Sequence, residues 1–75
     1  MAEQLKSTLT ILRRKQVENR VGLSRSHIYA RIKEGTFPKQ VRLGGKRAVG
    51  WVETEIDAWV AARVEERGQA ERAGQ

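Results

Sequence analysis

The sequence predicts a small, mainly α-helical domain with three helices and one β-hairpin. Three observations support this fold class: a stretch of helical spacing divided by a glycine, two alternating runs around a glycine pair, and a late apolar stripe of helical period. With 75 residues and no cysteine, the chain should form one domain with a marginal core. We expect this domain to span residues 9–67, between disordered ends at 1–8 and 68–75.

A short apolar run precedes the first expected helix. Residues 9–12 read LTIL, a pattern compatible with a short strand or with an extended segment that covers the core. Arg13, Arg14 and Lys15 follow at the start of the helix, where the helix dipole disfavours cations. Two interpretations of these charges stay open, a solvated helix start and a contact with phosphate.

Two short helices joined by a tight turn are predicted over residues 14–35. Gly22 should end the first helix and Gly35 the second, because glycine readily adopts the positive φ found just past a helix end. Ser24 is a suitable N-cap for the second helix, since its hydroxyl can accept from a free backbone N–H. The pattern fits a helix-turn-helix whose second helix, residues 24–34, is shaped to enter a DNA major groove. An ordinary helical hairpin around a small core is the alternative.

A β-hairpin is predicted over residues 41–51. Two runs of period-two alternation flank the pair Gly44 and Gly45, as in a hairpin closed by a tight turn. Three cations lie at or near its tip: Arg42, Lys46 and Arg47. A hairpin that follows a helix-turn-helix is a wing, and its cations can contact the sugar-phosphate backbone or enter a minor groove. The alternative is a structural hairpin whose charges keep its edge soluble.

The last predicted helix runs from about residue 53 to residue 66 and should end at Gly68. Its apolar residues recur at intervals of three and four and are expected to form one stripe facing the core: Ile56, Trp59, Val60 and Val64. Trp51 and Trp59 should contribute most to the core, and Phe37 should plug it beneath the helix pair.

Positive charge is concentrated in the first 50 residues. They carry 12 Lys and Arg against 3 Asp and Glu, a net charge of +9, whereas residues 51–75 have a net charge of −3. Such an asymmetry is expected of a nucleic-acid binder. An acidic membrane surface is the competing partner, but it requires a strongly amphipathic basic helix with bulky apolar residues, which none of the predicted helices provides.

The other function classes have less support. His27 is the single histidine and there is no cysteine, so we expect no metal site, no cofactor and no catalytic centre. No apolar run approaches the roughly 18 residues of a transmembrane helix and no signal peptide is recognisable, so a soluble, cytoplasmic protein is expected. A basic RNA-binding module would need an aromatic stacking platform. A protein-interaction module would need an exposed apolar patch, whereas the apolar residues here are nearly all assigned to the core.

The ordered part of the sequence resembles the AlpA-type phage and prophage regulators, small winged helix-turn-helix proteins related to excisionases and to MerR-like DNA-binding domains. The resemblance covers about residues 11–63. It is carried by these features in order: Gly22-Leu23-Ser24-Arg25-Ser26, Tyr29, Gly35, Phe37-Pro38, the run from Val41 to Gly44, Trp51, Glu55-Ile56 and Trp59.

The resemblance implies a double-stranded DNA binder within a mobile element. Such proteins activate or repress promoters, often for an integrase, or act as excisionase-type directionality factors that bend attachment-site DNA. A single small module covers little DNA, so self-association on repeated sites is expected as well. By position, the resemblance and the helical wheel give these candidate DNA contacts: Ser24, Arg25, Ser26, His27, Tyr29 and Lys33 in the second helix, and Arg42, Gly44, Gly45, Lys46 and Arg47 in the wing.

Three positions of the second helix qualify this assignment. Tyr29 should pack against the wing with its hydroxyl left for a phosphate. Ala30 occupies a place where relatives often carry a basic or polar residue, so no base contact is expected there. Arg31 replaces a commonly apolar residue, and that edge of the helix should be wetter.

Overall fold

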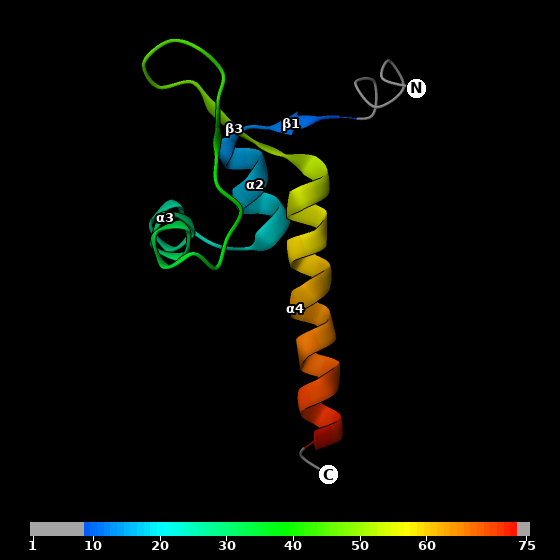
Figure 1. The fold of residues 1–75 in the computed structure, drawn as a ribbon. Helices are drawn as coiled ribbons and strands as arrows, with labels where there is room; N and C mark the ends of the chain where they lie inside the picture. Colours follow the sequence, from blue (N-terminus) through cyan, green and yellow to red (C-terminus); the bar gives the residue numbers. More distant parts are fainter. Residues whose placement is uncertain (1–8, 74–75) are drawn as a thin grey trace.

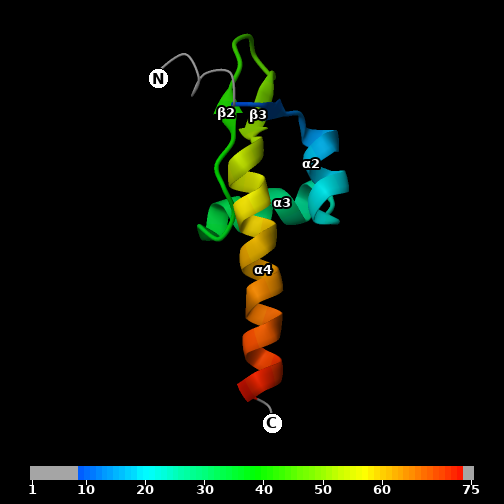
Figure 2. The same ribbon diagram turned by 90° about the vertical axis from the view of Figure 1, so that its right-hand side faces the viewer.

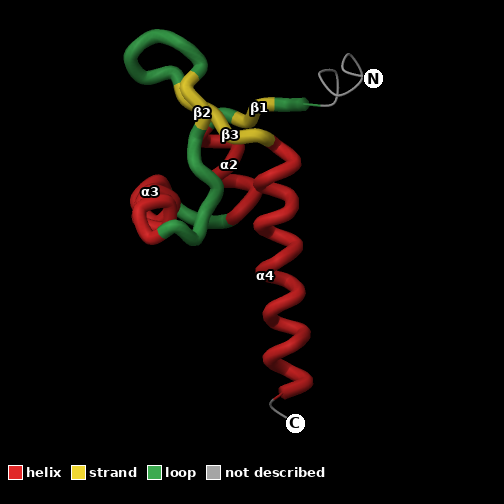
Figure 3. The backbone as a smooth tube through the Cα atoms, in the orientation of Figure 1, coloured by secondary structure: helices red, strands yellow, loops and turns green. Residues whose placement is uncertain are grey.

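A computed structural model describes residues 9–73, and the expectation for residues 1–8 lies outside them. The elements in order are β1 (Ile11–Leu12), α2 (Arg14–Val21), α3 (Arg25–Glu34), β2 (Val41–Arg42), β3 (Val49–Val52) and α4 (Glu53–Ala73). The strands form one antiparallel sheet in the order β1-β3-β2. Figure 1 and Figure 3 show this sheet at one end of the fold, α2 and α3 beside it, and α4 running away from it. The predicted mainly α fold with a wing is confirmed, and of the apolar run 9–12 only Ile11–Leu12 form a strand.

Local sequence sets the ends of α2 and α3 as predicted. Gly22 and Gly35 adopt left-handed φ values of 72° and 82° just past the two helices, a conformation that costs glycine little. The Ser24 hydroxyl caps α3 by accepting a backbone N–H of its first turn. At the start of α2, the Arg13 N–H donates to Oε1 of Gln16 at 2.8 Å, which satisfies a backbone donor that the helix itself leaves unpaired.

The core lies where the sheet meets the helices. Six buried apolar side chains form it: Leu12, Val17, Ile28, Phe37, Trp51 and Ile56. Trp51 is fully buried, and its Nε1 donates to the Pro38 carbonyl at 3.0 Å. Trp59 is only half-buried, although its Nε1 donates to the Thr36 carbonyl at 2.7 Å and its ring packs edge-on against Phe37. Of the two tryptophans assigned to the core, therefore, only Trp51 is fully part of it.

Helix α4 differs from its prediction at its far end. It continues past Gly68 to Ala73, into the segment expected to be a disordered tail. One glycine inside a helix costs only about 1 kcal/mol relative to alanine, and the alanine, glutamate and arginine residues around it favour helix. The apolar stripe also stops early, because Ile56 is fully buried and Val60 half-buried, whereas Val64 is 53% exposed. The core ends before Val64, and Figure 2 shows α4 extending far beyond the other elements.

Two further features fix the sheet and α4. Gly50 is buried in β3, where an added Cβ would lie 2.3 Å from Cγ2 of Ile11, so the packing of β1 requires glycine there. Arg20 of α2 pairs with Glu53 at 2.7 Å and with Asp57 at 3.1 Å, which ties α2 to the first turns of α4. Among the described residues, no helix is long and apolar enough to cross a membrane.

Candidate nucleic-acid interface

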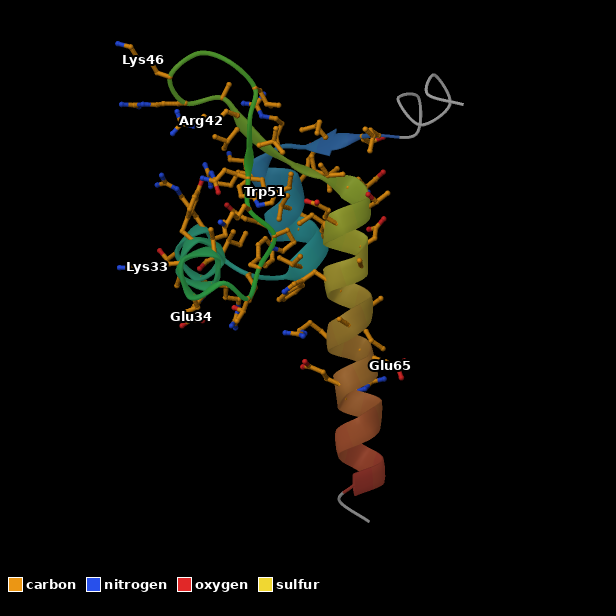
Figure 4. The ribbon with its side chains drawn as sticks, in the orientation of Figure 1. Lys33, Glu34, Arg42, Lys46, Trp51 and Glu65 are labelled. Carbon is orange, nitrogen blue, oxygen red and sulfur yellow. The ribbon has the colours of Figure 1, made fainter. Side chains whose placement is uncertain are left out.

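Helix α3 turns its apolar side inward and presents a small polar ridge. Ile28 is fully buried and Ile32 half-buried, as their spacing predicts. Ser26, Ala30 and Lys33 are exposed on the other side of the helix. Figure 4 shows Lys33 pointing away from the body of the molecule. Because no bulky apolar side chain stands on this ridge, α3 can approach a polar surface closely.

The start of α3 is held by a hydrogen-bonded cap. The Ser24 hydroxyl accepts from the His27 backbone N–H at 3.4 Å, and the same oxygen lies 2.9 Å from Nδ1 of His27. Which of these two side-chain groups donates depends on the tautomer of the ring. Both residues are exposed. Ser24 therefore serves the geometry of the helix start and orients the His27 ring.

The tip of the wing stands clear of the other elements (Figure 1). Strands β2 and β3 pair with Arg42 opposite Val49. Gly44 and Gly45 both have positive φ, 100° and 73°, so the turn uses conformations that other residues rarely adopt. Its three cations are all exposed: Arg42, Lys46 and Arg47. Lys46 points outward at the tip (Figure 4).

A groove of about 480 Å³ joins these parts, and we call it the basic groove. It is lined by Arg13, Arg14 and Lys15 at the start of α2, Arg25 and Tyr29 of α3, and Arg47 and Val49 of the wing. The guanidinium of Arg25 lies 5.6 Å from the centroid of the Tyr29 ring. That ring packs edge-on against Trp51, 6.3 Å between centroids. The core thus fixes one wall of the groove through its buried tryptophan.

The cations of the basic groove are mostly without acidic partners. Arg14 pairs with Glu18 at 2.5 Å. Within residues 9–73, no ion pair is formed by the other four cations: Arg13, Lys15, Arg25 and Arg47. Side chains of one sign gathered around a concave surface raise the local potential and attract ions of the opposite sign. The groove is therefore suited to an extended anion such as a phosphate backbone.

The basic groove contains only some of the residues predicted from the sequence. Arg25, Tyr29 and Arg47 line it, and the contact of Tyr29 with Trp51 confirms the expected packing against the wing. Eight predicted residues lie outside its lining: Ser24, Ser26, His27, Lys33, Arg42, Gly44, Gly45 and Lys46.

The start of α2 was not among the candidate site residues, although contact with phosphate was one of the two interpretations left open for its cations. The signal was present, because three successive cations at a helix N-terminus oppose the helix dipole and so need another reason to be there. The expectation of a wetter edge at Arg31 is wrong, since this side chain is half-buried and its Nε is shielded from solvent. The chain after Gly35 folds back over the end of α3, where Thr36 donates to the Arg31 carbonyl through both N–H and hydroxyl.

Among the described residues, no group of three or more His, Asp or Glu side chains is arranged so that it could hold a metal ion. The candidate interface has three surfaces: the exposed ridge of α3, the tip of the wing, and the basic groove that links the wing to α2.

Comparisons with known proteins identify the family. The family model described as prophage CP4-57 regulatory protein (AlpA) matches residues 10–64, which include every residue of the basic groove. The ORF88 protein of Enterobacteria phage P4 is 51% identical over 53 residues, which cover 71% of this chain and 59% of that protein, so the chain spans less than two thirds of this relative. AlpA of Escherichia coli, described as a DNA-binding transcriptional activator, is 38% identical over 64 residues, 77% of this chain and 90% of that protein. No solved structure matches the chain. The chain belongs to the AlpA family of prophage regulatory proteins.

Proposed function

We propose that this chain is a sequence-specific double-stranded DNA-binding regulator of a mobile element. It acts in the cytoplasm by binding DNA and catalyses no reaction. The observation that carries the proposal is the basic groove, where five cations from three elements converge beside the exposed ridge of α3. The similarity to AlpA of E. coli, whose description names DNA binding and transcriptional activation, supports it.

In the proposed complex, α3 lies in the major groove. Ser26, His27 and Lys33 are exposed on it, and side chains there can meet base edges whose donor and acceptor patterns differ between base pairs. The first helix of a helix-turn-helix crosses the backbone, which suits the cations at the start of α2. Lys46 and Arg42 of the wing would contact phosphates or the adjacent minor groove.

Binding to RNA is less favoured. Proteins that read single-stranded RNA stack bases on exposed aromatic rings. Here Trp51 and Phe37 are buried, and Tyr29 is half-buried against Trp51. Trp59 is half-buried against Phe37. Among the described residues these rings support the fold and form no platform for bases.

The proposal covers two roles, control of transcription and excision of the element together with an integrase. The two roles differ in where the protein binds. A footprint across the parent element should show protection at a promoter for the first role and at an attachment site for the second. The same footprint would supply the cognate duplex for the experiments that follow.

The first experiment tests the electrostatic part of the proposal. If about 4–6 phosphates are contacted, the logarithm of the affinity should fall with the logarithm of salt concentration at a slope of roughly −4 to −5. Fluorescence anisotropy on cognate and scrambled duplexes measures this slope. A flat salt response, or equal affinity for every duplex, would contradict specific DNA binding.

The second experiment assigns the contacts. The double variant Lys46→Ala, Arg47→Ala should weaken cognate and scrambled duplexes by similar factors and make the salt slope shallower by about 1–2. The variant Arg13→Ala, Lys15→Ala should do the same. The matched control is Arg63→Ala, Arg67→Ala, which removes two exposed cations from α4 and should leave affinity and slope for a single-site duplex nearly unchanged.

Ser26→Ala should instead lower cognate binding preferentially, by about 1–3 kcal/mol if a good base contact is lost. Ser26 is the cleaner test, because His27 also interacts with the cap of α3. If the wing variant lost discrimination while Ser26→Ala kept it, the wing would be the reader and the assignment would be reversed.

A further inference from the structure

The sheet carries an apolar surface on the side away from the core, which we call the outer sheet face. Side chains alternate along a strand, so Trp51 and Leu12 point into the core while their neighbours point the other way. The exposed side chains Ile11, Val41 and Leu43 lie on this face, 37–42% exposed. A Cβ built on Gly50 would meet both Ile11 and Leu43, so these two side chains converge over the glycine.

The outer sheet face continues into a groove of about 460 Å³, the apolar groove. It is lined by Pro38, Lys39, Val41, Val52, Glu55 and Ala58. Four of these side chains are apolar, and the two others are an exposed cation and an exposed anion. The sequence assigned nearly all apolar residues to the core, and this surface contradicts that assignment. An exposed apolar patch with a polar rim is typical of an interaction site.

A second exposed surface lies at the other end of the molecule, on residues 61–67 of α4, which we call distal α4. Every residue from 61 to 67 is exposed. Val64 is the large apolar side chain there, and Ala61 and Arg67 lie three positions before and after it on the same side of the helix. Figure 1 and Figure 2 both show this half of α4 projecting beyond the rest of the fold.

We propose that distal α4 of one copy docks in the apolar groove of a second copy. A concave groove accepts a convex helix, whereas a second sheet face would not enter it. Val64 and Ala61 are short side chains, so the helix backbone can approach the groove closely. The charges match as well, since Arg67 beside Val64 can pair with Glu55 at the groove rim.

The two surfaces are different parts of the chain, so the contact is head-to-tail and can repeat from copy to copy. A ridge of about two helical turns buries less than the roughly 1,200 Å² of a stable interface. The contact should therefore be weak between free molecules and become effective when neighbouring DNA sites hold copies together. This last step rests on the proposed function.

Val49 lines the basic groove and Val52 the apolar groove. The two residues lie on opposite faces of β3, so both grooves can be occupied at once.

The chain contains no cysteine, so introduced cysteines report the contact directly. Val41→Cys and Val64→Cys, mixed at high protein concentration under mild oxidation, should form a disulfide-linked heterodimer in several-fold excess over a mixture of Val41→Cys with Lys33→Cys. Lys33 is equally a surface position but lies on α3. Predominant Val41→Cys homodimers would show that the outer sheet face pairs with itself. A heterodimer yield no higher than in the Lys33→Cys control would show that distal α4 does not dock. Either result overturns the proposal.

A charge exchange sharpens the test. Glu55→Arg in the Val41→Cys partner should abolish the excess, and Arg67→Glu in the Val64→Cys partner should restore it. Glu34→Arg makes the same charge change on α3 and should have no effect. If Arg67→Glu did not restore the excess of heterodimer, the proposed pairing of Arg67 with Glu55 would be wrong. The assay contains no DNA, so its failure and a failure of duplex binding are observed separately.

Discussion

The two parts of α4 belong to one continuous helix but have different surroundings. In proximal α4, residues 53–60, Ile56 is fully buried and Trp59 packs against Phe37. In distal α4 every residue from 61 to 67 is exposed. The helical spacing of apolar residues continues from residue 60 to Val64, but the packed core ends at residue 60. The apolar period of a sequence therefore indicates that a helix forms and which side is apolar, whereas the end of the packed part depends on the size of the core it meets.

Electrostatics follows the same division. Arg20 anchors proximal α4 through Glu53 and Asp57. The hydrogen bond that Arg20 donates to the Glu53 carboxylate is the main cause that raises the pKa of Arg20 above its ordinary value. Distal α4 has instead a local pair, Arg63 with Glu66 at 2.6 Å, within one turn of the helix. The first arrangement connects two elements of the fold and the second only supports the helix.

The largest effect is expected at Ile56. Ile56→Ala should lower the free energy of unfolding by about 2–5 kcal/mol, because it removes one methylene and two methyl groups from a fully buried side chain and leaves a cavity. Urea unfolding followed by circular dichroism measures the loss. A change below about 0.5 kcal/mol, the range of ordinary surface substitutions, would mean that proximal α4 is not packed as described.

Trp59 should show an intermediate effect, since it lies at the boundary between the halves. Trp59→Ala removes a half-buried ring, its edge contact with Phe37 and its hydrogen bond to Thr36. We expect a loss of about 2–3 kcal/mol, less than for a fully buried tryptophan. Trp59→Phe, which keeps an aromatic ring but not the indole N–H, should recover part of it.

Local chemistry explains how much of this molecule could be predicted. Gly22, Ser24 and Gly35 act on their own helix ends, so both short helices follow from the sequence. The basic groove does not follow in that way, because the start of α2 meets the wing only after β1 pairs with β3. That pairing sets Leu12 opposite Trp51, and so brings Arg13 and Arg47 to one groove although they are distant in sequence.

A smaller effect is expected at Arg20, whose ion pairs are exposed. Arg20→Met should lower Tm slightly at low salt, and the difference should shrink as salt increases, because exposed pairs are screened. Because the pKa of Arg20 is raised, its stabilisation of the folded state is fully present below the ordinary arginine pKa and is lost only at strongly alkaline pH. The difference in Tm between Arg20→Met and the parent that is due to the charge of Arg20 should therefore not vary around neutral pH. Thermal melts at two salt concentrations and several pH values check both statements.

The smallest effect on stability is expected at Val64, and this variant separates folding from association. Val64 is 53% exposed, so Val64→Ala removes little buried surface, and alanine favours the helix more than valine does. The free energy of unfolding should stay within about 0.5 kcal/mol of the parent, as for most surface substitutions. A Val64→Ala loss comparable to that of Ile56→Ala would place Val64 in the core and extend the packed half of α4.

The same substitution removes the apolar side chain proposed to enter the apolar groove. In sedimentation at high concentration, Val64→Ala should therefore associate less than the parent while melting at the same temperature, and it should bind a single-site duplex with parental affinity, because distal α4 lies outside the basic groove.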